Sequence, residues 1–305
     1  MSSETPTAGP LRMPATVAVT GAMGFVASRL LPRLYERGVR VLALVRPGRD
    51  TAALPASPLL EFREGDLAEP ATLARAFTGA EAVVHLAGLS LVPDFLPAVL
   101  AAGVRSGVFI SSAGVHTKLK SGSAEAKRAG EQSLRDSALA YTILRPSMIY
   151  GTPRDRNMVR LLQWLERFPV MPSPLGGITP QQPVHVDDLV SAILASLERP
   201  QAARGEYEVG GPEPITLRDV IHTCARELGR PAWVLPLPLA PAHGAALLAR
   251  RWKLPFPVRP EQVLRLTESK AVDIEPARRD LGFSPRPFVE GIRAEVAMMR
   301  AARSR

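Results

Sequence analysis

Short apolar runs alternate with stretches of helical periodicity through the first half of the chain. The first run begins at Thr16, and later runs predict strands at Val41–Val45, Leu59–Arg63, Ala82–Leu86, Val108–Ser111 and Tyr141–Leu144. Helical spacing predicts helices at Phe25–Arg37, Ala71–Phe77, Pro93–Ala102 and Ala124–Ser137. Several runs are apolar at every position, as in strands covered on both faces. The pattern predicts an α/β fold, a Rossmann-type doubly wound parallel sheet with helices on both faces.

Beyond Gly151 the pattern changes to helices separated by proline-rich loops. The predicted helices are Asn157–Phe168, Asp187–Glu198, Leu217–Leu228 and a last one from Phe288 onward. Thr216 and Asp219 predict a helix cap. We expect a disordered N-terminal extension at residues 1–14 and a core at 15–150. Residues 151–305 are expected to form mainly a smaller C-terminal lobe, with 183–200 packing back on the core.

The first apolar run breaks at two glycines and then resumes with helical spacing. Gly21 permits a tight turn, Gly24 lets backbone N–H groups approach a pyrophosphate, and Ala27 allows close packing of a helix on the sheet. The positive end of the helix completes an anion site. This context favours a dinucleotide-binding core over the alternative, a plain strand-to-helix turn. The expected cofactor contacts in this motif are Gly21, Ala22, Met23, Gly24, Phe25 and Val26.

Composition narrows the classes of function. Of the 305 residues, 46% are hydrophobic and 22% are charged, which is typical of a folded, soluble protein. A single cysteine excludes an internal disulfide, and the five histidines lack metal-ligand spacing, so we expect no metal site and a cytoplasmic location. The polar start is unlike a signal peptide, and prolines interrupt the apolar segment Trp233–Ala249, so we expect no transmembrane segment. The net charge of +9 comes from scattered arginines, and we expect no nucleic-acid partner.

Seven motifs follow one another along nearly the whole chain, and their order and spacing are more specific than any one of them. They are Thr20-Gly-Ala-Met-Gly-Phe-Val-Ala27, Gly65-Asp-Leu67, Val83-Val-His-Leu-Ala-Gly88, Ile110-Ser-Ser-Ala-Gly-Val115, Leu144-Arg-Pro-Ser-Met-Ile-Tyr-Gly151, Pro183-Val-His-Val-Asp-Asp188 and Leu281-Gly-Phe-Ser-Pro285. Together they resemble the extended short-chain dehydrogenase/reductase superfamily, the NAD(P)-dependent epimerase/dehydratase-like group.

The resemblance implies how a dinucleotide would lie. Asp66 and Leu67 would flank the adenine, and Pro146 to Met148 would lie behind the nicotinamide. Further implied cofactor contacts are Leu86, Ala87, Gly88, Ser111 and Lys127. Asp66 could instead be a turn residue after a strand, and Leu86 to Gly88 could simply end a strand in small residues.

The second predicted strand ends in Val45 and Arg46 where an acidic residue would accept a hydrogen bond from a ribose 2′-hydroxyl. A guanidinium suits a 2′-phosphate through paired N–H donors. NADP(H) is therefore the favoured cofactor, with Arg49 as a second contact. The alternative is a solvated Arg46, in which case NAD(H) is used.

The catalytic residues depart from the family pattern of Tyr-x-x-x-Lys plus a serine or threonine. Lys127 matches the lysine and Ser112 the serine, but Ser123 stands at the tyrosine position. A serine hydroxyl is a far weaker acid than a phenol and cannot inherit its role. Tyr150, His116 or a polarised water are the candidate replacements. The alternatives are a packing role for Tyr150 and a solvated loop position for His116.

Two hypotheses remain open. The first is an NADP(H)-dependent oxidoreductase or epimerase/dehydratase-like enzyme that acts on a carbonyl or hydroxyl of a sugar-nucleotide or lipid-like small molecule. The second is a non-catalytic NADPH-binding sensor or assembly protein, which the missing tyrosine favours. In the first case, the substrate would be covered by Trp233–Ala249, Trp252 and Phe256, and Arg250, Arg251 and Lys253 would meet an anionic group or simply end a helix in solvent. The sequence leaves open whether the protein forms a homodimer.

Overall fold

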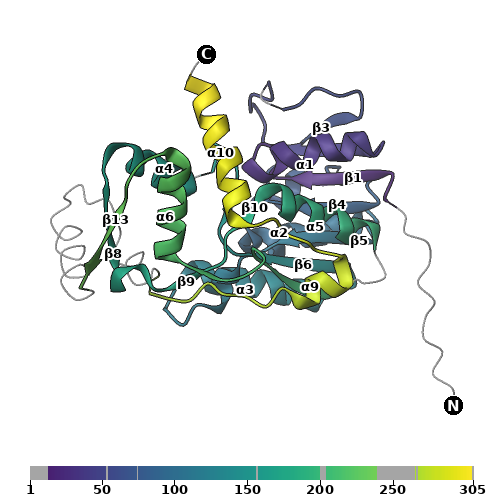
Figure 1. Ribbon diagram of the computed structural model, residues 1–305. Helices are drawn as coiled ribbons and strands as arrows, with labels where there is room; N and C mark the ends of the chain where they lie inside the picture. Colours follow the sequence, from purple (N-terminus) through teal and green to yellow (C-terminus); the bar gives the residue numbers. More distant parts are fainter. Residues whose placement is uncertain are drawn as a thin grey trace.

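The computed structural model describes residues 13–52, 54–73, 75–155, 157–199, 204–238, 265 and 267–303, and these contain a seven-stranded sheet (Figure 1). Its strands are β1 (Thr16–Thr20), β2 (Arg40–Val45), β3 (Leu60–Glu64), β4 (Ala82–His85), β5 (Ser106–Ile110), β6 (Ala140–Pro146) and β11 (Gly205–Val209). Their spatial order is β11-β6-β5-β4-β1-β2-β3, and every neighbouring pair is parallel. The strand order reverses between β1 and β4, which opens a crevice at the carboxyl ends of the strands.

Helices cover both faces of the sheet. On one face lie α1 (Phe25–Glu36), α5 (Val186–Glu198) and α9 (Glu275–Leu281), whose buried side chains share one apolar core with the sheet. On the other face lie α2 (Val92–Ala101) and α3 (Gly122–Arg135), with a separate core. This arrangement is the α/β, Rossmann-type doubly wound fold that the apolar runs predict.

A smaller group of elements forms the C-terminal lobe. Its helices α4 (Met158–Arg167), α6 (Leu217–Leu228) and α10 (Phe288–Arg303) surround a third apolar core. Three two-stranded pairs complete it: β7 (Ile149–Tyr150) with β10 (Val184–His185), β9 (Pro180–Gln181) with β12 (Ile215–Thr216), and β8 (Val170–Pro174) with β13 (Trp233–Leu237). In the described part of the chain, no helix combines the length and apolar character needed to cross a bilayer.

Short 3₁₀ turns connect these elements. They are η1 (Pro70–Leu73), η2 (Leu89–Leu91), η3 (Ala113–His116) and η4 (Leu175–Gly177). The helix expected at Ala71–Phe77 is wrong, because only η1 forms there before the chain continues as turns. The Thr72 hydroxyl accepts from Asp66 N at 2.9 Å and donates to Glu69 O at 2.8 Å. Such side-chain bonds to the backbone compete with a helix.

The C-terminal half contributes more to the sheet side than its helical pattern predicts. β11 adds the seventh strand beside β6, and α9 packs beside it. The Arg29 guanidinium on α1 donates two bonds of 2.7 and 2.8 Å to Asp187 on α5, so α5 lies against the core. The predicted cap of α6 is confirmed as a capping box between Thr216 and Asp219. The expected extension at 1–14 and the cover segment fall largely outside the described residues, as do Arg250, Arg251, Trp252, Lys253 and Phe256.

Candidate functional site

The glycine-rich turn between β1 and α1 is compact because it lies directly against the end of β4. Gly21 has a φ of +70°, and Gly24 N donates to Gly21 O at 2.9 Å. A Cβ added to Gly21 would lie 2.9 Å from Ala87 N, so a larger residue has no room there. The first turn of α1 contains no acidic residue and no side chain caps it. Its free N–H groups are therefore available to an anion.

A cavity of about 430 Å³ lies beside this turn, at the carboxyl ends of β1, β2, β3 and β4. Most of its lining consists of residues expected to contact a cofactor: Gly21, Ala22, Met23, Gly24, Arg46, Asp66, Leu67, Leu86 and Ala87. The Asp66 carboxylate accepts from Ala68 N at 3.0 Å, so it also serves as a turn residue. A small, glycine-walled cavity at the start of a helix fits the adenosine and diphosphate part of a dinucleotide.

A second cavity, of about 460 Å³, continues from the first around the end of β2. The two cavities share Arg46, Arg49 and Asp66, and the second also reaches Glu69 and Thr72. Both arginine side chains are solvent-exposed. Arg46 and Arg49 thus line one cavity, at the end of β2 where the ribose of an adenosine would lie.

A third and larger cavity, of about 820 Å³, lies at the ends of β5 and β6 and under the C-terminal lobe. The predicted site residues Phe25, Ser112, Pro146 and Met148 line it. The Ser112 hydroxyl caps η3 by accepting from Gly114 N at 3.1 Å. Within the described ranges, no acceptor takes its hydroxyl proton, which leaves that proton free for a bound molecule.

Lys127 lies on the first half of α3 and is half-buried. Its Nζ donates to the Ser123 hydroxyl at 3.2 Å, one helical turn earlier, where the family has a tyrosine. Burial and the nearby positive charge of Arg265 lower the pKa of Lys127. Arg265 lines the large cavity and donates to Ser121 at 2.7 Å. Lys127 itself lines none of the three cavities described above.

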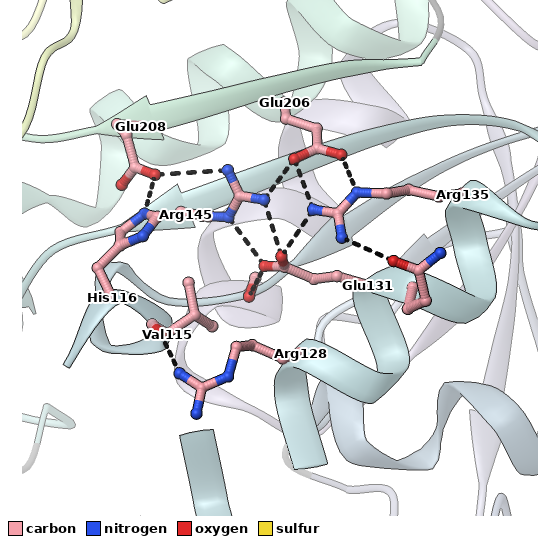
Figure 2. Close-up of polar contacts among 10 residues, drawn as sticks. Val115, His116, Arg128, Glu131, Arg135, Arg145, Glu206 and Glu208 are labelled. Atoms are coloured by element: carbon pink, nitrogen blue, oxygen red, sulfur yellow. Dashed lines mark hydrogen bonds and ion pairs between the residues drawn. The ribbon is translucent and has the colours of Figure 1, made fainter. Parts of the chain in front are cut away.

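Tyr150 and His116 do not lie at this cavity, which corrects the expectation that either one replaces the phenol. Tyr150 is fully buried, and its hydroxyl donates to Phe288 O at 3.3 Å. Its ring packs edge-on against His185 and Phe288, and burial raises its pKa further from neutrality. Tyr150 therefore has the packing role that was its alternative. His116 Nε2 lies 2.7 Å from Glu208 Oε1 at the surface (Figure 2).

Three other expected cofactor contacts are placed differently. Val26 packs against the apolar core, and the carbonyl oxygen of Gly88 lies 3.2 Å from Nε2 of His85. The Ser111 hydroxyl donates to Glu131 at 2.6 Å and is 7% exposed. None of the three lines the cavities just described. For Ser111 the cause is that successive side chains of an extended strand point to opposite faces, so Ser111 meets Glu131 while Ser112 lines the cavity.

A buried carboxyl pair adjoins the large cavity and was missed by sequence reasoning. Asp155 lines the cavity and caps α4, accepting from Met158 N at 2.7 Å and Val159 N at 3.2 Å. Glu295, on α10, is fully buried and accepts from Gly151 N at 3.0 Å. Burial, and then the hydrogen bond and charge of Asp155, raise the pKa of Glu295 to about 9. Glu295 is therefore protonated near neutral pH.

A second group of missed residues closes the cavity from the C-terminal side. The Thr117 hydroxyl and Lys118 N donate to Glu268 at 2.8 and 3.1 Å. Lys270 Nζ donates to the same carboxylate at 3.2 Å. Asp155 precedes a predicted helix and could have been found as its cap. Glu268 and Lys270 lie about 150 residues from Thr117 and carry no local signal.

Known proteins give an independent comparison. A family model described as NAD(P)H-binding matches residues 21–169. The chain is 30% identical to the ceramide reductase of Caulobacter vibrioides over 77% of this chain and 78% of that protein. It is 31% identical to the (4-alkanoyl-5-oxo-2,5-dihydrofuran-3-yl)methyl phosphate reductase of Streptomyces griseus subsp. griseus over 89% of this chain and 95% of that protein.

A solved structure agrees with the fold. The UDP-glucose 4-epimerase of Thermus thermophilus in complex with NAD superposes with a TM-score of 0.70 and 23% identity, covering 94% of this chain and 99% of that one. The glycine turn, the cavities along the carboxyl edge of the sheet and these two reductase relatives agree. The chain belongs to the NAD(P)-binding, epimerase-like family of short-chain dehydrogenases and reductases.

Proposed function

We propose that the protein is an NADP(H)-dependent oxidoreductase or epimerase/dehydratase-like enzyme acting on a carbonyl or hydroxyl group. One observation carries the proposal: the dinucleotide-sized cavities lead along the sheet edge to a larger one that contains Ser112. A binding protein without chemistry has no need of a serine with a free hydroxyl proton at that point. The reductase relatives support the same reaction class.

The cofactor is NADP(H) rather than NAD(H) in this proposal. Arg46 and Arg49 line the cavity next to Asp66, and two exposed guanidinium groups favour a doubly charged phosphate over a hydroxyl. When bound, NADPH supplies the hydride. The glycine turn holds its diphosphate, and Pro146 and Met148 form the wall behind its nicotinamide.

Ser112 and Lys127 have distinct roles. The Ser112 hydroxyl donates to the reacting oxygen and so favours the negative charge that develops there. Lys127 holds the nicotinamide ribose, and Arg265 in the lining of the large cavity adds a positive charge. A water molecule polarised by these groups delivers the proton in place of the absent phenol.

The substrate is a sugar-nucleotide or lipid-like molecule, and the charges favour one that carries a phosphate. Arg154 and Arg265 are exposed cations in the lining of the large cavity, whereas Lys270 is paired with Glu268. Guanidinium groups bind phosphates through paired donors. A phosphate-bearing substrate is in the name of the Streptomyces relative, which supports this class.

The alternative is a non-catalytic NADPH-binding sensor, which one observation favours: the exposed Ser123 hydroxyl stands where the family has a phenol. In a sensor, cofactor occupancy would stabilise one conformation for a partner to recognise.

One experiment separates the two. NADPH oxidation is followed with phenanthrenequinone, 4-keto sugar nucleotides and enones, together with NADPH binding by calorimetry. The enzyme proposal expects turnover that Ser112→Ala and Lys127→Met reduce by a factor of about 100 or more, while the variants stay folded. Tight NADPH binding without turnover of any substrate would refute it and favour the sensor.

A further inference from the structure

The residue that precedes the Ser112 turn, Ser111, is hydrogen-bonded to α3. The Ser111 hydroxyl donates to Glu131 Oε1 at 2.6 Å, and Glu131 is only 2% exposed. Glu131 follows Lys127 by four positions on α3, so both side chains lie on the same face of that helix. The residue before Ser112 is therefore attached to the helix face that presents Lys127.

The same turn is held again at its far end. Arg128 on α3 donates to Val115 O at 2.6 Å, and His116 Nε2 lies 2.7 Å from Glu208 Oε1 on β11. Within the turn, Val115 N donates to the carbonyl oxygen of Ser112 at 3.0 Å. Figure 2 shows the Arg128 side chain reaching from α3 to Val115, and the His116 side chain reaching from the turn to Glu208.

Arg145 on β6 joins the two attachments. Its Nε and Nη2 donate to the two oxygens of Glu131, both at 2.8 Å, and its Nη1 lies 3.5 Å from Glu208 Oε1. A further hydrogen bond connects it to Glu206, which also accepts from Arg135 at 2.6 Å (Figure 2). Arg145 is 8% exposed, and a planar guanidinium with several bonds of fixed direction is a rigid connector.

The charges of this network keep it intact at ordinary pH. Burial raises the pKa of Glu131, but hydrogen bonds from Arg145 and Ser111 outweigh it and leave the pKa below its usual value. The hydrogen bond from Arg135 and the positive charge of Arg145 lower the pKa of Glu206 to about 2. Both carboxyl groups therefore remain acceptors.

We infer that Glu131, Arg145, Glu208 and His116 are positioning residues, a clamp that fixes the Ser112 hydroxyl relative to Lys127. The clamp holds the turn on both sides of Ser112, and α3 supplies one attachment and Lys127 alike. Because a misplacement of about 1 Å is enough to cost a reaction about a hundredfold in rate, a clamp of this kind acts on turnover rather than on binding. This inference rests on the proposed oxidoreductase function for its catalytic part.

The test uses His116→Ala and Glu208→Ala in the full chain, because Arg145→Ala would leave buried Glu131 unpaired. Amide hydrogen exchange of Gly114 and Val115 reports the turn directly, since both N–H groups bond to Ser112. We expect exchange of these two amides to accelerate about tenfold in both variants, with a Tm shift below about 2 °C. Turnover of phenanthrenequinone is expected to fall about tenfold in kcat, with KM and the Kd for NADPH unchanged.

Two further variants serve as controls. Glu208→Gln keeps an acceptor for His116 and is expected to restore most of kcat. Arg303→Gln breaks a comparable ion pair with Glu166, whose bonds measure 2.7 and 2.6 Å, and is expected to leave the turn and kcat as in the parent.

The outcomes are distinct. Unchanged exchange at Gly114 and Val115 in both alanine variants would overturn the clamp whatever the activity. Faster exchange with an unchanged kcat would overturn its positioning role. If the parent protein turns over no carbonyl, the proposed function has failed, and faster exchange would still establish that the clamp holds the turn.

Discussion

Replacing Glu295 with glutamine should remove a large part of the pH dependence of folding stability. Glu295 is fully buried, and its pKa is about 9 in the folded protein against an ordinary value of 4.5. The folded state thus holds a proton that the unfolded state releases above pH 4.5. The stabilisation linked to this proton is complete below pH 4.5 and is lost as the pH rises through 9.

The size of the effect follows from the width of that window. Each unit of pKa difference corresponds to about 1.4 kcal/mol, so the full window of 4.5 units is worth about 6 kcal/mol. Between pH 5 and pH 8 the wild type should lose about 4 kcal/mol that the glutamine variant does not lose. Glutamine can donate to Asp155 and accept from Gly151 N as the protonated acid does.

The assay is urea unfolding of Glu295→Gln and the wild type, followed by circular dichroism at four pH values from 5 to 8. The difference in the free energy of unfolding between the two proteins should grow steadily in favour of the variant as the pH rises. Glu290→Gln, at an exposed position of the same helix, should track the wild type. Parallel stability curves for Glu295→Gln and the wild type would refute the reasoning, because they would mean that Glu295 is ionised when buried.

Three further substitutions test the cofactor site and the packing of α3. Gly21→Val should abolish NADPH binding in calorimetry and lower the free energy of unfolding, because φ there is +70° and a Cβ would lie 2.9 Å from Ala87 N. Circular dichroism checks that the variant is folded, and retained affinity would contradict the glycine turn as the diphosphate site. Arg46→Ala should weaken NADPH binding about tenfold to a hundredfold and leave NADH binding unchanged, and an equal loss for both would argue against a 2′-phosphate contact. Gly130→Ala should destabilise the protein by about 1–3 kcal/mol in urea unfolding, because its Cβ would meet Leu89 O at 2.1 Å. Gly122→Ala on the same helix has open space and should be neutral or slightly stabilising. Equal effects of the two substitutions would contradict close packing of α3 on η2.

The strands and the glycine turn were predictable because their signals are local. A continuous apolar run such as Val41–Val45 needs no knowledge of distant residues to indicate a buried parallel strand. The prediction of a helix at Ala71–Phe77 failed because the Thr72 hydroxyl competes with the helix for backbone groups. Hydrophobic periodicity does not report that competition. β11 was missed because its alternation of Glu206, Tyr207 and Glu208 is short and lies between helices.

In the candidate site, too, residues with a local sequence signal were predictable, whereas contacts between distant residues were not. The residues of the glycine turn and Arg46 line one cavity, because parallel strands end at one edge of the sheet. The contacts that hold the site join residues far apart in sequence, such as Ser111 with Glu131 and His116 with Glu208, 92 positions away. No periodicity or spacing carries that information, so roles for Ser111, His116 and Tyr150 could only be assigned from the folded chain.

The late seventh strand has a consequence for how the protein is made. β11 is translated some sixty residues after its neighbour β6, yet it supplies the carboxylates of Glu206 and Glu208 to the guanidinium of Arg145. A nascent chain that stops near residue 150 would present the unpaired edge of β6, and Arg145 would keep Glu131 as a partner but lack Glu206 and Glu208. The nucleotide-binding half is therefore not a separable module. The edge of β6 is covered only once β11 has been made, and fragments cut between the halves should aggregate.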